Sequence, residues 1–197
     1  MWEWIQTMDW AILRGLRQAT TCGFLNYWMP KITMLGNAGV LWLLTAAGLL
    51  ISRKYRRYGV LLLAALAVGA LIGNLCLKPL VARARPCWLE VTELLIAVPK
   101  DYSFPSGHTL ASVIGAAVLT AANRRFAFWA VPAAMLIAFS RLYLDVHFPT
   151  DVLMAALLGL ALALAVLSVA RRLWPEKCEP SGGALPDPEE RRETETV

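Results

Sequence analysis

Residues 32–52 read ITMLGNAGVLWLLTAAGLLIS and contain no charged side chain. A helix of about 20 apolar residues is long enough to cross the ~30 Å hydrocarbon core of a bilayer. The run ends at a basic cluster made of Arg53, Lys54, Arg56 and Arg57. Cationic side chains at the end of an apolar run are typical of a helix that leaves the membrane. This stretch therefore predicts a transmembrane helix.

Four further apolar runs follow, at about 58–77, 108–123, 126–141 and 151–170. The runs at 108–123 and 126–141 are short, about 22 Å each as helices, and we interpret them as a hairpin whose outer ends stop below the membrane surface. His108 and Arg141 would then lie near the depth of the lipid headgroups. The chain is 58% apolar and 17% charged, whereas soluble domains are about 45–50% apolar and about 25% charged. We expect an all-α, polytopic membrane bundle of five to six transmembrane helices.

The two ends of the chain differ from this apolar body. Residues 1–30 combine aromatic and charged side chains with apolar residues at helical spacing. We expect an amphipathic helix in the membrane interface there, with a sixth span as the alternative. Residues 175–197 contain seven acidic and three basic residues among prolines and glycines, so we expect a disordered acidic tail. Residues 1–174 are then one membrane-embedded domain.

Basic residues predict the orientation in the membrane. The clusters at 53–57, 124–125 and 171–172 all lie at span ends on one side of the bundle. A similar number of cations lies on the other side, but several of those belong to the motifs described below. The positive-inside rule places the clusters and the C-terminus in the cytoplasm of a bacterial-type plasma membrane. The basic residues stand between the apolar runs and do not form an exposed basic stripe, so no nucleic-acid partner is expected.

Three segments on the non-cytoplasmic side carry the informative polar residues. They read KPLVARARP at 78–86, PSGH at 105–108 and SRLYLDVHFPTD at 140–151. The chain has only two histidines, and both lie in these segments. Cations that converge with imidazoles at one membrane face suit a phosphate group, whose charge is spread over several oxygens.

The residue types also suggest separate roles in binding a phosphate group and in catalysis. A helix that begins at Ser106 and Gly107 offers free backbone N–H groups to an anion. One imidazole can attack phosphorus while the other protonates the departing oxygen. Asp151 lies four residues after His147. A carboxylate at this spacing can hold the imidazole N–H and leave the other ring nitrogen free to attack.

These segments resemble the motifs of the type 2 phosphatidic acid phosphatase family, which is related to bacterial acid phosphatases and vanadium haloperoxidases. The patterns Lys-x6-Arg-Pro, Pro-Ser-Gly-His and Ser-Arg-x5-His-x3-Asp occur in this order. The resemblance implies that His147 is the nucleophile, Asp151 its partner, and His108 the acid for the leaving group. It implies that the phosphoryl oxygens are bound by Lys78, Arg85, Ser106, Gly107 and Arg141. It also implies that no metal or other cofactor is needed, and the outer face has no acidic cluster that would suit magnesium.

Other polar residues near the motifs have simpler interpretations. We interpret Arg83 as a residue at a span end whose side chain reaches the membrane surface, and Asp145 as part of a solvated loop. Ser140 is expected to cap a helix or to orient Arg141. Residues 87–99 alternate apolar and acidic side chains, which predicts a lid or a short surface helix.

The sequence favours a lipid phosphatase, because a site at headgroup depth suits an amphiphilic substrate whose tail stays in the bilayer. The substrate is an undecaprenyl-type diphosphate or a glycerophospholipid phosphate such as phosphatidic acid or phosphatidylglycerol phosphate. The motifs do not separate these, since they bind only the terminal phosphoryl group. The alternative is a phosphotransferase that passes the phosphoryl group to a sugar or lipid hydroxyl. A non-catalytic anion-binding protein is disfavoured, since binding alone needs no histidine pair with an aspartate.

Overall fold

The computed structural model describes residues 2–90 and 93–174, and these residues form helices and loops without any strand. The elements in chain order are α1 (Trp2–Thr20), α2 (Gly23–Leu35), η1 (Asn37–Gly39), α3 (Val40–Ile51), α4 (Arg56–Gly69), η2 (Ala70–Leu77), α5 (Lys78–Val81), α6 (Pro86–Leu89), α7 (Gly107–Ala122), η3 (Arg124–Phe126), α8 (Ala127–Tyr143) and α9 (Pro149–Leu173). The all-α fold expected from the sequence is confirmed.

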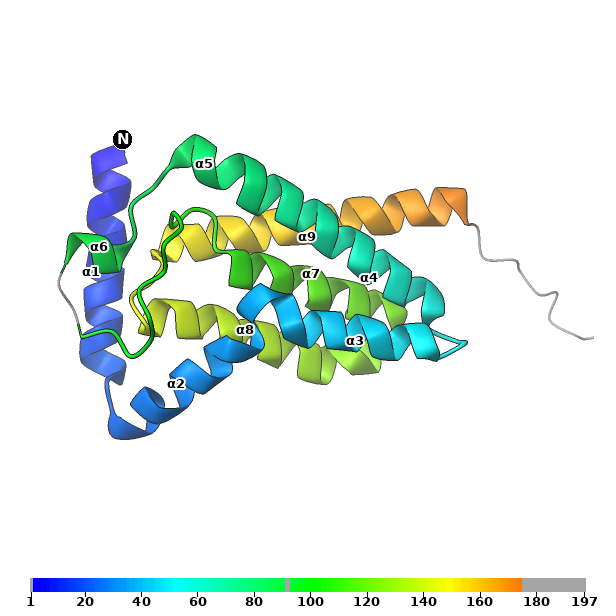
Figure 1. The fold of residues 1–197 in the computed structure, drawn as a ribbon, viewed down its shortest axis with the longest axis horizontal. Helices are drawn as coiled ribbons and strands as arrows, with labels where there is room; N and C mark the ends of the chain where they lie inside the picture. Colours follow the sequence, from blue (N-terminus) through cyan, green and yellow to red (C-terminus); the bar gives the residue numbers. More distant parts are fainter. Residues whose placement is uncertain (1, 91–92, 175–197) are drawn as a thin grey trace, which may run out of the picture.

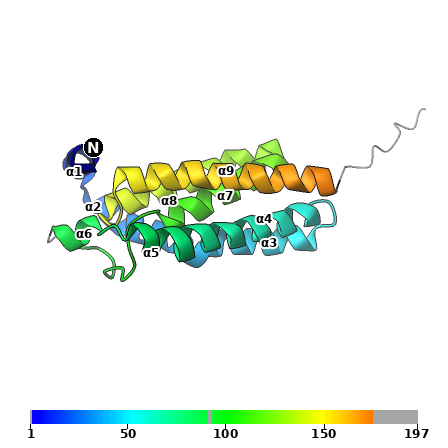
Figure 2. The same ribbon diagram turned by 90° about the horizontal axis from the view of Figure 1, so that it is seen from above.

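The long helices run side by side, and α1 lies across one end of them (Figure 1). Seen from above, α9, α7 and α8 lie on one side of the molecule, and α3 and α4 lie on the other (Figure 2). α7 packs against α4, α8 and α9. The fold is thus a helical bundle around α7, with α1 placed outside it at one end.

Small residues allow the close packing of α7. Trp42 of α3 is fully buried, and a Cβ added at Gly115 of α7 would lie 2.2 Å from its indole ring. A Cβ added at Gly159 of α9 would lie 3.0 Å from the carbonyl oxygen of Leu110. Close approach through small residues is the usual way in which helices associate in lipid, because lipid gives no hydrophobic driving force between them.

Several helices are long and apolar enough to cross a membrane. They are Arg56–Leu89, Arg124–Tyr143 and Pro149–Leu173, together with α2 and α3 if that bent pair counts as one span. α7 is apolar but shorter. The chain is a multi-pass membrane protein, with three or four candidate spans among the described residues, and the expected number of five to six stays a prediction.

The first apolar run does not form the single straight helix expected for residues 32–52. The chain bends by 47° between α2 and the helix that follows it. The bend lies at Gly36, and the next residues include Ala38 and Gly39 with φ angles of 49° and 69°. This left-handed conformation cannot continue an α-helix. A Cβ at Gly36 would lie 2.6 Å from Cδ2 of His108, so the bend brings η1 against the N-terminus of α7.

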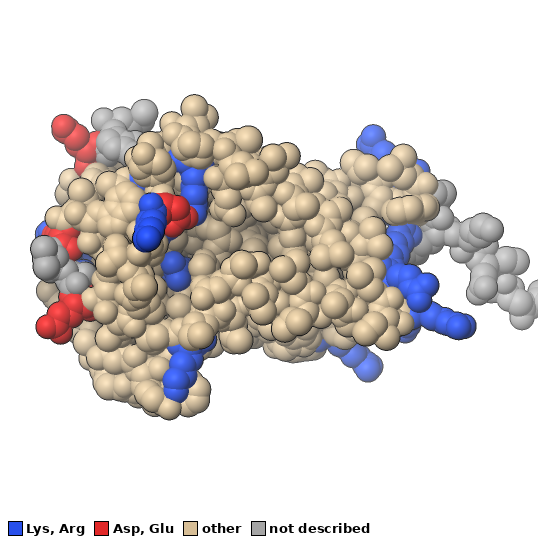
Figure 3. Space-filling view, in the orientation of Figure 1, with Lys and Arg blue, Asp and Glu red and all other residues tan. Residues whose placement is uncertain are grey.

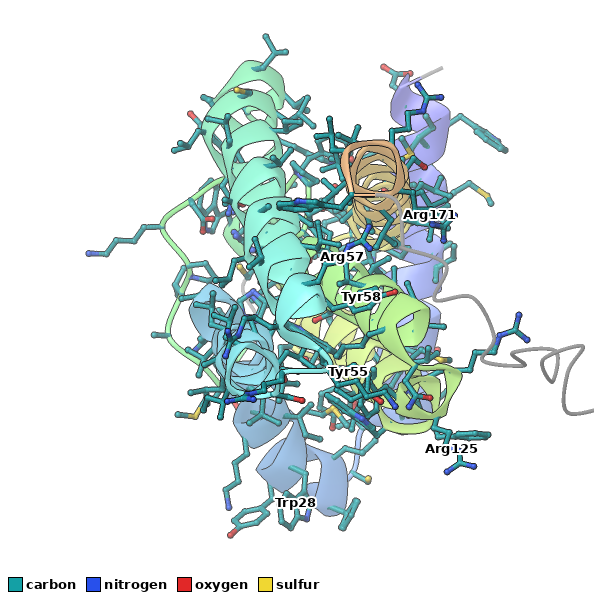
Figure 4. All side chains as sticks on the ribbon, turned by 90° about the vertical axis from the view of Figure 1, so that its right-hand side faces the viewer. Trp28, Tyr55, Arg57, Tyr58, Arg125 and Arg171 are labelled. Carbon is teal, nitrogen blue, oxygen red and sulfur yellow. The ribbon has the colours of Figure 1, made fainter. Side chains whose placement is uncertain are left out.

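Charged side chains gather toward the two ends of the bundle, with a largely uncharged surface between them (Figure 3). One end carries the three basic clusters recognised in the sequence. Figure 4 looks onto this end and shows Arg57 of α4, Arg125 of η3 and Arg171 of α9. α1, α5 and α6 lie at the other end (Figure 1). The acidic tail expected to be disordered, residues 175–197, lies outside the described residues.

Candidate active site

A cavity of about 1130 Å³ lies at the α1 end of the bundle, opposite the basic clusters. Figure 3 shows basic side chains in and around this hollow, with an acidic side chain beside them. Six of the eight candidate residues line it, namely Lys78, Arg85, Gly107, His108, Arg141 and His147. The other two, Ser106 and Asp151, are completely buried behind the lining. Three segments that are far apart in the sequence therefore meet at one cavity.

Helix ends position these side chains. Lys78 begins α5 where the π-helix η2 ends, and Arg141 lies in the last turn of α8. The hydroxyl of Ser106 caps α7 by accepting from the N–H of Thr109 at 3.5 Å. Gly107 starts α7 at the cavity wall. The first N–H groups of a helix have no partner within the helix, so this end of α7 offers donors to an anion.

His147 lies in the loop between α8 and α9 and is 1% exposed. Its Nε2 is 3.1 Å from Nη1 of Arg85. Its Nδ1 is 3.4 Å from the hydroxyl of Ser103, which donates in turn to Oδ2 of Asp151 at 2.5 Å. The direct distance from Nδ1 to Oδ2 of Asp151 is 3.9 Å, too long for a hydrogen bond. The contact between His147 and Asp151 that the sequence suggested therefore passes through Ser103.

These contacts define the protonation state of His147. A guanidinium can only donate, so Nε2 accepts from Arg85 and carries a lone pair, and the ring proton lies on Nδ1 facing Ser103. Burial, together with the positive charges of Arg85, Arg141 and Lys78, lowers the pKa of His147 well below its usual value. The imidazole is therefore neutral near pH 7, and the lone pair on Nε2, which accepts from Arg85 in this structure, is the one that could act as a nucleophile.

Asp101 is a second residue that the sequence analysis missed. Its carboxylate pairs with Lys78 and, through Oδ1, with Nη2 of Arg85 at 2.8 Å. Its backbone carbonyl accepts from Nε of Arg85 at 2.6 Å. Burial raises the pKa of the Asp101 carboxyl, but Lys78 and Arg85 outweigh this effect and the net pKa is lowered. An ionised carboxylate is thus paired with two of the cations expected to bind phosphate.

The bent α2–η1–α3 segment supplies partners for the remaining site residues. Nε2 of His108 is 2.9 Å from Oδ1 of Asn37 in η1, so His108 donates there. Nη1 of Arg141 donates to the hydroxyl of Thr33 in α2 at 2.5 Å. Ser140, next to Arg141, donates to the carbonyl of Ile137 within its own helix at 2.7 Å.

Arg83 does not reach the membrane surface, and that interpretation was wrong. The residue is 7% exposed. Its Nη1 lies 2.6 Å from Oδ1 of Asp151, and its Nη2 lies 2.6 Å from Oδ2 of Asp9 in α1. Asp145 is not part of a solvated loop either, since it is 8% exposed and lies 2.8 Å from Nη2 of Arg17. Both errors have one cause: Asp9, which is one of the two carboxylates that pair with Arg83, and Arg17, the partner of Asp145, lie on α1, whose position the local sequence does not reveal.

Ser103 and Asp101 had a weak sequence signal, since they stand just upstream of PSGH in the segment DYSFPSGH. Asn37 and Asp9 had none, because each lies in a helical segment distant from the motifs. Among residues 2–90 and 93–174, no group of three or more His, Cys, Asp or Glu side chains is arranged to hold a metal ion.

The cavity continues from the charged end into an apolar groove. Its lining includes Leu43 of α3, Leu63 and Leu66 of α4, and Ile114 of α7. The loop residues 95–99 cover part of the same cavity. One space thus joins a cationic site to the apolar side of the bundle, as an amphiphilic ligand with a long apolar chain would require.

Comparisons with known proteins agree with this geometry. The family model described as the PAP2 superfamily matches residues 57–175. An undecaprenyl-diphosphatase of Sulfolobus acidocaldarius is 34% identical over 138 residues, which make up 68% of this chain and 66% of that protein. The undecaprenyl-diphosphatase BcrC of Bacillus subtilis is 32% identical over 103 residues, 52% of this chain and 51% of the relative. The chain thus spans about half to two thirds of the length of these relatives.

Two crystal structures share the fold over most of their length. One is the first transmembrane PAP2 type phosphatidylglycerolphosphate phosphatase from Bacillus subtilis, with a TM-score of 0.72 and 28% identity over 88% of this chain and 89% of that one. The other is LpxE of Aquifex aeolicus, also with a TM-score of 0.72 and 28% identity, over 82% of this chain and 95% of that one.

Proposed function

This chain belongs to the PAP2 superfamily, and on that premise we propose that it is a membrane lipid phosphatase that works through a phosphohistidine on His147. One observation carries the proposal: a buried, neutral imidazole with Nε2 beside Arg85 lines a cavity together with three cations, and that cavity continues into an apolar groove. The charged end suits a phosphoryl group and the groove suits the tail of a lipid.

The reaction has two balanced steps. First, Nε2 of His147 forms a bond to phosphorus while the bond from phosphorus to the leaving oxygen breaks. His108, which takes up a proton once the negative phosphoryl group lies beside the cations of the site, gives that proton to the leaving oxygen. Second, a water molecule gives a proton to His108. The oxygen of this water bonds to phosphorus as the Nε2–P bond breaks. Inorganic phosphate leaves and both histidines return to their starting forms. Asp151 acts through Ser103 to keep the Nδ1 proton in place.

Positive charge and helix-end donors stabilise the transferred group. Lys78, Arg85 and Arg141 line the cavity and neutralise the phosphoryl oxygens, and the start of α7 at Gly107 adds backbone N–H groups. The hydroxyl of Ser106 is engaged with Thr109. Its part in phosphate binding is therefore to hold the N-terminus of α7 in place.

An undecaprenyl-type diphosphate is the substrate that we favour, because both curated relatives reported above are undecaprenyl-diphosphatases. A glycerophospholipid phosphate is the second candidate, since one structural relative is a phosphatidylglycerolphosphate phosphatase. Kinetics on both lipids, measured side by side with the same detergent-purified protein and with EDTA present, distinguish them. We expect the higher kcat/KM on undecaprenyl diphosphate.

Replacement of the nucleophile tests the reaction itself. His147→Ala should lower kcat by about 1000-fold or more while the protein still unfolds at a similar temperature. Retention of full turnover by this variant would exclude the phosphohistidine mechanism. Appearance of labelled phosphate on an added sugar or lipid alcohol, with none released into solution, would favour the phosphotransferase instead.

We propose that the cavity opens on the non-cytoplasmic face and that the basic end lies in the cytoplasm, as the positive-inside rule predicts. The chain offers a direct test through Cys22, an exposed residue between α1 and α2. In a background where the other cysteines are replaced by serine, a membrane-impermeant maleimide should label Cys22 in intact cells. With Cys22 also replaced, Lys54→Cys should react only after lysis, and the reverse pattern would overturn the orientation.

A further inference from the structure

Arg83 joins three parts of the chain behind the active site. Its Nη1 contacts Oδ1 of Asp151 at 2.6 Å and the hydroxyl of Thr150 at 2.8 Å. Its Nη2 contacts Oδ2 of Asp9 and Oε1 of Gln6, both on α1, at 2.6 and 2.7 Å. The guanidinium carbon also lies 4.2 Å from the centre of the Phe148 ring. Arg83, Asp9 and Asp151 of this cluster are buried, Gln6 and Thr150 are half-buried, and none of the five lines the cavity.

Arg83 reaches both groups that orient His147. Its side chain holds Oδ1 of Asp151, while Oδ2 of the same carboxylate accepts from the Ser103 hydroxyl and from the N–H of Phe148. Its backbone carbonyl accepts from the N–H of Ser103 at 2.8 Å. The carboxylate therefore has partners on both oxygens, which determine its rotation and hence the position of the Ser103 bridge to Nδ1.

Asp9 attaches this cluster to α1. Asp9 is 1% exposed, and its carboxylate accepts from both the N–H and the hydroxyl of Thr150, in the first turn of α9. A neighbouring stripe of α1 is apolar and exposed at Trp4, Met8 and Ile12. The helix thus carries a buried acid against the active-site loop and, beside it, residues suited to a membrane surface.

We propose that Arg83 is a positioning residue for the Asp151–Ser103–His147 chain and that Asp9 holds it, so that α1 is a working part of the active site. This inference rests on the proposed function of His147 as the nucleophile. Without Arg83, Oδ1 of Asp151 is left in a buried place without its charged partner. The carboxylate can then rotate, the Nδ1 proton is held less firmly, and Nε2 points less often at phosphorus.

The kinetic test compares Arg83→Gln with a control variant that removes a different ion pair of α1. Arg17 of α1 pairs with Asp145 in the loop that precedes His147, so Arg17→Gln removes an α1 ion pair that does not touch Asp151. We expect Arg83→Gln and Asp9→Asn to lower kcat by about 10- to 100-fold with KM changed less than about 3-fold, because the phosphate-binding cations are untouched. Arg17→Gln should lower kcat less than about 3-fold.

A double-mutant cycle separates positioning from general destabilisation. If Arg83 acts through Asp151, then Arg83→Gln added to Asp151→Asn should lower kcat by less than about 2-fold further. Full additivity of the two losses, or an equal loss in Arg17→Gln, would show that Arg83 merely supports the fold and would overturn the proposal.

The state of His147 can also be read without any substrate. Since the chain has two histidines, ¹⁵N-histidine labelling gives two sets of ring resonances, which His108→Gln assigns. The His147 ring resonances should move in Arg83→Gln and stay in place in Arg17→Gln. Unmoved His147 resonances would refute the role of Arg83, whereas a wild-type protein inactive on lipid phosphates would refute the proposed function only.

Discussion

His147 is held by contacts that a phosphate must partly replace. Arg85 donates to Nε2 of His147 and also pairs with Asp101. In the proposed reaction, the carboxylate of Asp101 therefore competes with the phosphoryl group for Lys78 and Arg85, and it repels that group electrostatically. Substrate binding has to displace Asp101 or share Arg85 and Lys78 with it.

Asp101→Asn should strengthen phosphate binding. Loss of one competing carboxylate interaction of about 1 kcal/mol corresponds to about a 5-fold lower inhibition constant for inorganic phosphate. The inhibition constant and KM of the purified protein check this. Glu90→Gln is the matched control, because Glu90 pairs with Arg14 and not with a cavity cation. Weaker phosphate inhibition in Asp101→Asn would mean that Asp101 orients the cations instead of competing for them.

The neutral His147 predicts how stability depends on pH. Burial and the nearby cations lower the pKa of His147 in the folded protein, while the unfolded chain keeps a pKa near 6.5. Above about pH 6.5 neither state is protonated, and below it only the unfolded state takes up the proton, so acid lowers the free energy of unfolding. The melting temperature should fall between pH 7.5 and 5 by more in the wild type than in His147→Gln. Equal falls would contradict a depressed pKa.

The bent pair α2–α3 is the element that contacts His108, the residue proposed to protonate the leaving group, and Arg141. In this bent segment, Asn37 forms a hydrogen bond with His108, and Thr33 forms one with Arg141. The glycine at the bend is required for close approach, since the ring of His108 packs where a Cβ would stand.

Gly36→Ala should damage both stability and activity. The added Cβ would lie 2.6 Å from Cδ2 of His108 and 2.9 Å from Cγ2 of Ile137, and overpacking of this kind costs about 1–3 kcal/mol. Gly48→Ala is the control, because nothing lies within 4 Å of its added Cβ, and an alanine inside a helix adds about 0.5–1 kcal/mol over glycine. Thermal unfolding and kcat of the two variants check this. Similar effects from both would contradict the packing argument.

At the scale of the whole molecule, the cavity connects the charged end of the bundle with its apolar side. Its groove runs between α3 and α4 over α7, and Ala67 lines it. A bulky side chain there should exclude a long lipid tail and leave the phosphate site intact.

Ala67→Trp should therefore separate lipid from soluble substrates. We expect kcat/KM on a long-chain lipid phosphate to fall by about 10-fold or more, because fewer buried methylene groups mean about 0.8 kcal/mol lost for each. Turnover of a water-soluble phosphate ester should change less than about 3-fold. Ala64→Trp, on the same helix but outside the cavity lining, is the control. Equal losses on both substrates would mean that the groove does not hold the tail.

Much of the bundle could be predicted from local pattern. Apolar runs near 58–77, 126–141 and 151–170 coincide with long helices of the structure, because the length of a span depends on consecutive apolar residues. The bend at Gly36 was missed, since a glycine within an apolar run fits a straight helix equally well. Only its contact with His108 reveals why the chain turns there.

The amino-acid sequence by itself determined the helical class, the membrane setting and the three segments that meet at the cavity, since each depends on residue type and short spacing. The tertiary structure alone decided the partners: Ser103 between His147 and Asp151, Asp101 on the cations, Asn37 on His108, and Arg83 between Asp151 and α1. All four sets of contacts join residues of different chain segments; Ser103, for example, lies 44 positions from His147. Such contacts follow from how the helices pack, and helix packing cannot be predicted from a local sequence pattern.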